Sequence, residues 1–229
     1  MKLYAFAYAG GDGHVFFPMK TELKEMGITV FPYMYRGRNN RQEEGHYRSI
    51  EEIAEEAAAF IKETNTEQEY MIIGHSMGSL VAYECYQKIL EQGLKLPVKM
   101  IFSGVLPPDQ LHQNKYTLEN DTQLVKQLAE LGGMAEDVLE LPEFKEYFLP
   151  IIKNDILIFD KYKFKKLPKI KVPVTVLTGD SDVISGEKVL GWKRHVEADP
   201  TFIEAKGNHF FLFNGSVAYR ELFQKICWT

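Results

Sequence analysis

The alternation of short apolar runs with longer segments of helical periodicity constrains the fold of this chain more than any other feature. Apolar runs of strand length occupy residues 2–8, 28–34, 69–73, 98–102, 172–177 and 201–204. Helical spacing of apolar residues occurs in residues 14–26, 49–62, 79–90, 186–196 and 210–226. Strands that alternate with helices run parallel, because each helix returns the chain to the same edge of the sheet. The alternation predicts an α/β fold with a mostly parallel central sheet flanked by helices.

The alternation stops in residues 107–167, where no run of strand length occurs. Two segments there have helical spacing, residues 122–131 and 142–159. Pro150 predicts a kink in the second, because proline lacks the amide hydrogen that a helix interior needs. We therefore expect a single domain over residues 1–229, interrupted by a helical insertion at 107–167.

The composition is that of a globular protein and argues against several classes of function. Hydrophobic residues make up 45% and charged residues 26%, which is enough apolar surface for a core. The formal net charge of -5 offers no basic field, so no nucleic acid partner is expected. No apolar run reaches the roughly 18 residues of a membrane-spanning helix, and no signal-peptide pattern opens the chain. We expect a cytoplasmic protein without a membrane partner, and a monomer.

The two cysteines, Cys85 and Cys227, lie far apart and lack the spacing of metal ligands. This spacing predicts neither a disulfide framework nor a zinc site. We expect both to be buried thiols.

Residues 74–78 read Gly-His-Ser-Met-Gly and match the G-x-S-x-G pattern of a nucleophile elbow. The match lies directly after an apolar run and directly before a helical segment, as that turn requires. Its glycines are needed because the strained backbone at Ser76 brings strands and helix close together. The following helix points its first N–H groups at the serine, so Met77 can donate to a carbonyl oxygen that becomes negative. The alternative is a glycine-rich turn without chemistry.

A serine nucleophile needs a general base, and His209 is the histidine best placed to supply it. It lies past the last expected strand and before the last expected helix, where a loop can present its ring beside Ser76. The alternative for His209 is a partly buried histidine that caps the helix. His75 lies inside the elbow and is expected to pack against the turn or position it.

The carboxylate that orients the base should lie just past the apolar run 172–177, where the sequence reads Gly179-Asp180-Ser181-Asp182. Asp182 is preferred because its spacing places it on the loop beyond the strand. Asp180 remains an alternative, although it is close enough to the strand end to bond backbone amides of the turn. The order serine, aspartate, histidine is that of an α/β-hydrolase.

The glycine-rich stretch at residues 8–13 should supply a second donor for the oxyanion. It reads Tyr-Ala-Gly-Gly-Asp-Gly, which lacks the full spacing of a dinucleotide-binding turn. The chain also has no acidic residue at the end of the next expected strand to bind a ribose. The glycines are therefore expected to bring backbone N–H groups near Ser76.

Taken together, these segments resemble the type II (editing) thioesterases of nonribosomal peptide and polyketide synthases. The likeness runs nearly end to end in ordered motifs: residues 6–11, 36–38 with Arg41, 74–78, 102–104 followed by 107–108, 131–133, Asp155, Tyr162, 179–182, Trp192 and 207–212. The chain departs from the family pattern at Ala7, at Arg36 and at Asn208, where the family has proline, proline and glycine. None of these departures removes a proposed catalytic group.

The resemblance implies a serine thioesterase that hydrolyses acyl groups from phosphopantetheine thioesters on acyl or peptidyl carrier proteins. It implies that Ala9 and Met77 supply the oxyanion-hole amides. No metal and no bound cofactor are expected, because the phosphopantetheine belongs to the partner. The insertion is expected to form a lid whose apolar residues line the acyl channel: Leu139, Leu141, Phe144, Phe148 and Ile152.

Other functions remain open from the sequence. The same three groups could serve a general carboxylesterase or a lipase-like hydrolase. A non-catalytic binding protein could keep the elbow as scaffold. The arginines at positions 36, 38 and 41 are expected to form internal ion pairs or a solvated loop, and docking of an acidic carrier protein is the alternative.

Overall fold

The computed structural model describes residues 1–229 except 66, 112–115, 134–135, 140, 185 and 229. Its centre is a six-stranded sheet with the order β2-β1-β3-β4-β5-β6, in which every neighbouring pair is parallel. The strands are β1 (Lys2–Phe6), β2 (Thr29–Pro32), β3 (Tyr70–His75), β4 (Lys99–Ser103), β5 (Val174–Gly179) and β6 (Thr201–Ala205). The prediction of a parallel α/β fold is confirmed.

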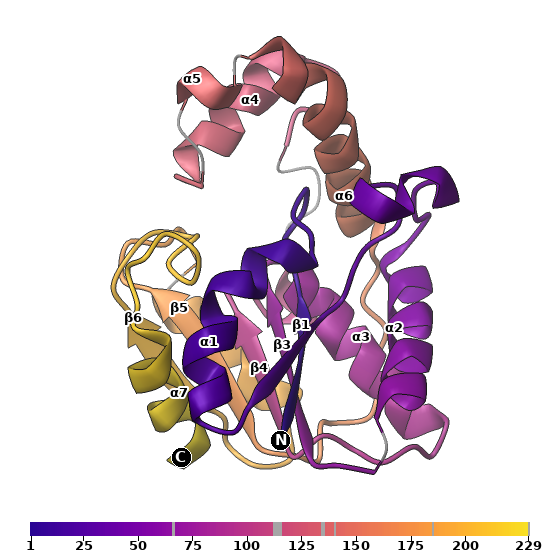
Figure 1. The fold of residues 1–229 in the computed structure, drawn as a ribbon, viewed down its shortest axis with the longest axis vertical. Helices are drawn as coiled ribbons and strands as arrows, with labels where there is room; N and C mark the ends of the chain where they lie inside the picture. The colour runs from indigo at the N-terminus through magenta and orange to yellow at the C-terminus, as the bar shows by residue number, and fades with distance from the viewer. Residues whose placement is uncertain (66, 112–115, 134–135, 140, 185, 229) are drawn as a thin grey trace.

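Helices cover both faces of the sheet (Figure 1). One face carries α1 (Phe17–Glu25), preceded by the short η1 (Gly13–Phe16), together with α7 (Tyr219–Trp228). The other carries α2 (Ile50–Thr64) and α3 (Met77–Glu91), which pack against each other. α2 begins after Ser49, whose side chain accepts a hydrogen bond from the backbone N–H of Glu52, as expected for a serine cap.

The helices between β4 and β5 lie over the carboxyl ends of the strands (Figure 1). It contains η3 (Pro108–Gln110), α4 (Asp121–Glu130), α5 (Glu136–Leu139), the π-helical turn η4 (Phe144–Phe148) and α6 (Leu149–Lys161). The kink expected at Pro150 takes the form of a boundary between η4 and α6. Pro150 stands in the first turn of α6, where a missing N–H costs no hydrogen bond.

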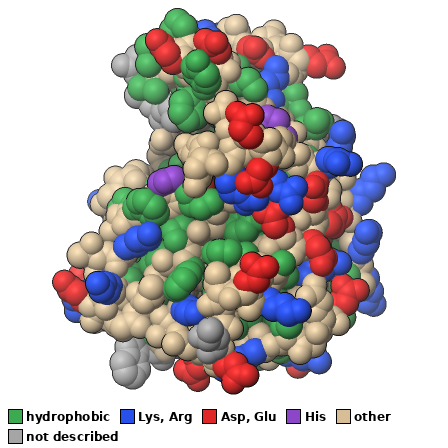
Figure 2. Space-filling view, turned by 45° about the vertical axis from the view of Figure 1, so that its right-hand side comes forward, with side chains coloured by type: hydrophobic (Ala, Val, Ile, Leu, Met, Phe, Trp, Pro, Cys, Tyr) green, Lys and Arg blue, Asp and Glu red, His purple; other side chains and the backbone are tan. Residues whose placement is uncertain are grey.

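This segment has a small hydrophobic cluster of its own. The buried members are Leu124, Val125, Leu139, Phe144, Leu149, Ile152 and Ile156. Several large apolar side chains remain exposed on it, among them Leu141, Tyr147 and Phe148. Figure 2 shows apolar side chains gathered on this upper lobe, above the body of the molecule.

Two expected helices differ in the structure. Residues 186–194 form a 3-10 helix, η5 (Gly186–Arg194), because its two glycines weaken α-helical propensity. The last helix begins at Tyr219, and the residues before it form turns. Asn208 accepts from the Phe210 N–H and Asn214 accepts from the Ser216 N–H, bonds that compete with a helix.

The cysteines are confirmed as free thiols, but the expected burial is wrong for one of them. Cys85 is buried within α3, whereas Cys227 is exposed because it lies on the outer face of the last helix. Within the described ranges, no helix is both long enough and apolar enough to cross a membrane.

Candidate active site

Ser76 lies in the sharp turn between β3 and α3, with backbone angles φ 54° and ψ -120°. A left-handed conformation at a residue other than glycine costs about 1–3 kcal/mol and is typical of functional sites. A Cβ atom at Gly74 would lie 2.1 Å from the carbonyl oxygen of Gly78, and one at Gly78 would lie 2.1 Å from that of Phe6. The steric need for these two glycines is confirmed.

Ala9 and Met77 line the same cavity as Ser76, and their backbone amides are the candidates for an oxyanion hole. Met77 is the first residue of α3, and Ala9 belongs to the loop after β1. Neither N–H group has a protein acceptor among the residues that the structure describes. Because unpaired donors at a helix start favour negative charge, Met77 can stabilise an oxyanion there.

His209 is held by a buried carboxylate. Its Nδ1 lies 3.0 Å from Oδ2 and 3.1 Å from Oδ1 of Asp182. The Asp182 side chain is fully buried, and its Oδ1 also accepts from the backbone N–H of Ile184. This arrangement holds the imidazole with the proton on Nδ1 and leaves Nε2 able to accept another.

Asp180 has a different environment from Asp182. Its Oδ1 accepts from the backbone N–H of Gly207 at 2.9 Å and from the hydroxyl of Ser181 at 3.0 Å. The bond from Gly207 is the main cause that lowers the pKa of the exposed Asp180 carboxyl. Asp180 therefore braces the turn that precedes His209, and the structure brings only Asp182 of the two against the histidine ring.

His75 packs behind the site. It is fully buried, its Nδ1 lies 2.9 Å from Oγ of Ser103, and its ring centroid is 5.1 Å from that of His209. Burial first, and then the nearby His209, holds the pKa of His75 well below its usual value.

Ser76, Met77, Ala9 and His209 line one cavity of about 330 Å³. Its remaining wall is mostly apolar. The helical segment between β4 and β5 contributes Leu128, Leu131, Ile156 and Phe159. An apolar cavity with a few convergent polar groups is the usual form of a small-molecule site. The groups present suit acyl transfer, and the described residues include no cluster of metal ligands.

Comparison with known proteins also indicates an acyl-transfer enzyme. The family model of the thioesterase domain matches residues 1–227. The chain belongs to the thioesterase family. It is therefore an enzyme of the thioester hydrolase class, as the sequence predicts.

Individual relatives show which kind of thioesterase this chain resembles. Thioesterase PikA5 of Streptomyces venezuelae is 30% identical over 220 residues, which cover 93% of this chain and 75% of PikA5. The RedJ thioesterase from the prodiginine pathway of Streptomyces coelicolor has a TM-score of 0.87 and 28% identity, covering 98% of this chain and 84% of RedJ. BorB, a type II thioesterase from the borrelidin cluster, has a TM-score of 0.85 and 26% identity, and the match covers 98% of this chain and 91% of BorB. The predicted resemblance to type II thioesterases of synthase pathways is confirmed.

A second cavity of the thioesterase, of about 690 Å³, adjoins the first. Tyr8, Ala9 and Phe210 are among the residues that line both. Four residues expected to line an acyl channel lie on this larger cavity: Leu139, Phe144, Phe148 and Ile152. The fifth, Leu141, is exposed and lines neither cavity.

Sequence reasoning missed the residues of the helical segment that line the cavity of Ser76. The amphipathic spacing of α4 and α6 indicates that each has an apolar face. It does not indicate which part of that face packs within the segment and which part meets the cavity. Ile156, for example, belongs to the segment's own cluster and also to the cavity wall.

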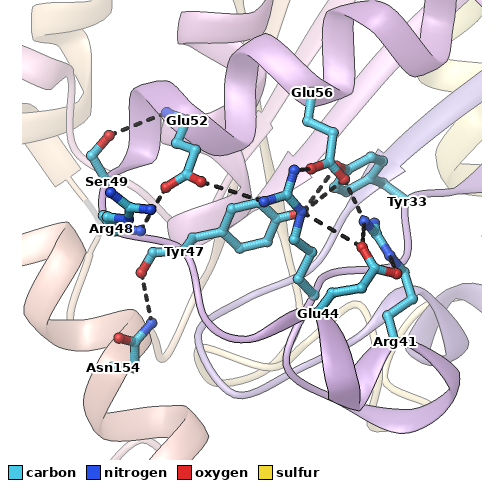
Figure 3. Close-up of polar contacts among 10 residues, drawn as sticks. Tyr33, Arg41, Glu44, Tyr47, Arg48, Ser49, Glu52, Glu56 and Asn154 are labelled. Atoms are coloured by element: carbon cyan, nitrogen blue, oxygen red, sulfur yellow. Dashed lines mark hydrogen bonds and ion pairs between the residues drawn. The ribbon is translucent and has the colours of Figure 1, made fainter.

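Two of the thioesterase's clustered arginines bind a carboxylate of α2, and Figure 3 shows one of them, Arg41, beside Glu56. Arg36 and Arg41 both pair with Glu56, the latter at 2.7 Å. The hydroxyls of Tyr33 and Tyr47 donate to the same carboxylate at 2.6 and 3.0 Å. Arg36 and Arg41 therefore form ion pairs within the protein, which is one of the two arrangements expected from the sequence.

Proposed function

We propose that this thioesterase hydrolyses acyl groups from phosphopantetheine thioesters on carrier proteins, and so clears misprimed or stalled modules of a nonribosomal peptide or polyketide synthase. The observation that carries the proposal is the mostly apolar cavity that Ser76, His209, Ala9 and Met77 line together. Relatives from the prodiginine and borrelidin pathways support the synthase context. A substrate on a synthase would place the enzyme in the cytoplasm.

In the first step, Ser76 Oγ attacks the thioester carbonyl while His209 Nε2 takes the hydroxyl proton. The carbonyl oxygen becomes negative and accepts hydrogen bonds from the amides of Ala9 and Met77. Collapse of this intermediate breaks the carbon–sulfur bond. The imidazolium returns its proton to the leaving thiolate, and the acyl group stays on Ser76 as an ester.

In the second step, water attacks the acyl ester while His209 takes one of its protons. The second tetrahedral intermediate collapses with release of the Ser76 oxygen, which recovers its proton from His209. The products are the free acid and the unloaded carrier. Asp182 stabilises the imidazolium in both steps through its hydrogen bond to Nδ1.

We propose that residues 107–167 act as a lid over this site. Their position over the carboxyl ends of the strands and their share of the cavity wall support this role (Figure 1). These residues have a hydrophobic cluster of their own, while Ile158 and Tyr162 belong to the main core, so we expect motion in α4 and α5 rather than in the end of α6.

The substrate class is tested by comparing an acyl thioester on a holo carrier protein with the matched oxygen ester of the same acyl group. We expect the carrier thioester to have the higher kcat/KM by at least about 100-fold, since remote contacts with the arm and carrier add transition-state stabilisation. Intact-protein mass spectrometry follows carrier unloading, and released acid measures ester hydrolysis. Equal values for the two substrates would favour a general carboxylesterase instead.

The lid's contribution to the acyl site is tested by replacing Ile156 with tryptophan. The larger side chain should fill part of the cavity, so kcat/KM for long acyl chains should fall at least about tenfold more than that for acetyl. Leu157→Trp is the matched control, because Leu157 is 38% exposed on the same helix and lines neither cavity. The same acyl-length profile in both variants would contradict the proposed wall.

A further inference from the structure

A buried ion pair joins α6 to the loop after β1. Arg38 is 5% exposed and Asp155 is fully buried. The Nη1 and Nη2 atoms of Arg38 lie 2.9 and 2.8 Å from the two carboxylate oxygens of Asp155, a bidentate geometry. The same carboxylate accepts from the Gly10 N–H at 2.8 Å, and Arg38 donates to the carbonyl oxygen of Gly11 at 2.6 Å. Both partners therefore hold the backbone of the loop that carries Ala9.

That loop is a tight turn whose shape depends on these contacts. The Gly11 N–H donates to the carbonyl oxygen of Tyr8 at 2.9 Å, so Ala9 and Gly10 are the central residues of a β-turn. Gly10 has φ +80°, as the third residue of a type II turn requires. The common turn types differ in the orientation of the peptide between the central residues. Asp155 accepts a hydrogen bond from the Gly10 N–H, which belongs to the peptide between Ala9 and Gly10. This bond selects one orientation of that peptide and therefore fixes the ψ angle of Ala9.

Attachment of α6 to the body does not by itself require these charges. The side chain of Asn154, the preceding residue, donates to the carbonyl oxygen of Tyr47 at 3.2 Å (Figure 3). Ile152 packs on the loop, where a Cβ atom at Gly10 would lie 2.3 Å from its Cγ1. Desolvation of two charges often cancels their attraction, so a buried pair is weak support for a purely stabilising role. What the pair adds is a set of directed bonds to the loop.

We propose that Arg38 and Asp155 are positioning residues that hold the Ala9 amide where the oxyanion forms, and that they couple this amide to α6. The inference rests on the proposed function, because the oxyanion arises only in acyl transfer. An Asn at position 155 keeps the size of the side chain but has one acceptor oxygen in place of two. It cannot serve the Gly10 N–H and both guanidinium donors together.

The experiment compares Asp155→Asn with Asn154→Ala in the full chain, using an acyl-pantetheine thioester. We expect Asp155→Asn to lower kcat by about 10- to 100-fold with KM changed by less than about threefold, because misplacing a donor affects the transition state more than the ground state. Asn154→Ala removes the neighbouring contact of the same helix and should keep kcat within about twofold.

A second readout reports on the oxyanion itself. An alkyl trifluoromethyl ketone adds reversibly to Ser76 as a hemiketal whose oxygen occupies the oxyanion position. Its inhibition constant should rise in Asp155→Asn by the same factor by which kcat/KM falls. If Asp155 had a purely structural role, the urea midpoint would fall in Asp155→Asn as it does in Asn154→Ala, and the inhibition constant would stay unchanged.

Arg38→Lys provides a further variant, since lysine keeps the charge but loses the bidentate bonds. We expect the same direction of change in kcat and in the inhibition constant. The inference would be overturned if kcat and the inhibition constant of both Asp155→Asn and Arg38→Lys equalled those of Asn154→Ala. The proposed function would then still stand, provided that the wild-type enzyme hydrolyses the thioester. A wild-type enzyme that releases no acid would instead refute the proposed function.

Discussion

Replacing Ser76 with alanine is expected to reduce kcat for an acyl-carrier thioester by about 10⁴- to 10⁶-fold, as loss of the nucleophile does in serine hydrolases. The reason is that no covalent intermediate can form, while the cavity and the two amides remain. Release of the carrier thiol, followed with a chromogenic thiol reagent, measures the loss. A serine-directed fluorophosphonate should label the wild type once and fail to label the variant.

Ser181→Ala is the matched control for this experiment. Ser181 is exposed and its hydroxyl contacts Asp180, so its removal should change turnover by less than about threefold. Ser76→Ala should keep the urea midpoint of the wild type, because the Ser76 side chain does not cap α3. A folded Ser76→Ala protein with wild-type turnover would exclude Ser76 as the nucleophile.

Asp182→Asn is expected to lower kcat by about 10⁴-fold. The amide presents an NH₂ group or a weaker acceptor to His209 Nδ1, so the ring is no longer held with its proton on that nitrogen. The reaction then lacks a base at Nε2 and a carboxylate that stabilises the imidazolium. Steady-state kinetics with the carrier thioester measure the effect.

Asp180→Asn applies the same chemical change two residues away. Its remaining side-chain oxygen can still accept from the Gly207 N–H, so kcat should stay within about threefold of the wild type. The pair of variants therefore separates the two carboxylates that sequence analysis leaves open. Equal losses in both would mean that the turn around residues 179–182, and not the Asp182 carboxylate, limits the reaction.

The fold follows from the sequence because the buried strands and amphipathic helices have strong local patterns. β3, β4 and β5 are buried over their whole length and appear in the sequence as largely apolar runs. The elbow is equally local, since its glycines and its neighbouring elements are all within one stretch of chain. The order of strand, serine, strand, aspartate and histidine then identifies candidates for the site.

What the sequence could not provide depends on contacts between distant segments. The residues before α7 have apolar spacing that suggests a helix, but the side chains of Asn208 and Asn214 bond nearby amides and hold turns instead. The bond from Gly10 to Asp155 joins residues 145 positions apart, and nothing in the spacing of either segment indicates it. Tertiary packing likewise decides which apolar residues of α4 and α6 line the cavity.

The first residue after each of β3, β4 and β5 donates its N–H to a carbonyl oxygen of the next strand in the sheet: Ser76 to Ser103, Gly104 to Leu177, and Asp180 to Ala205. The reactive groups are thus anchored to the sheet, while Leu128, Leu131, Ile156 and Phe159 of the cavity wall come from the helical segment between β4 and β5. Under the proposed function, acyl preference can therefore change through substitutions in that segment while the groups that break the bond stay the same. Exchange of residues 107–167 between relatives offers a practical route to altered selectivity.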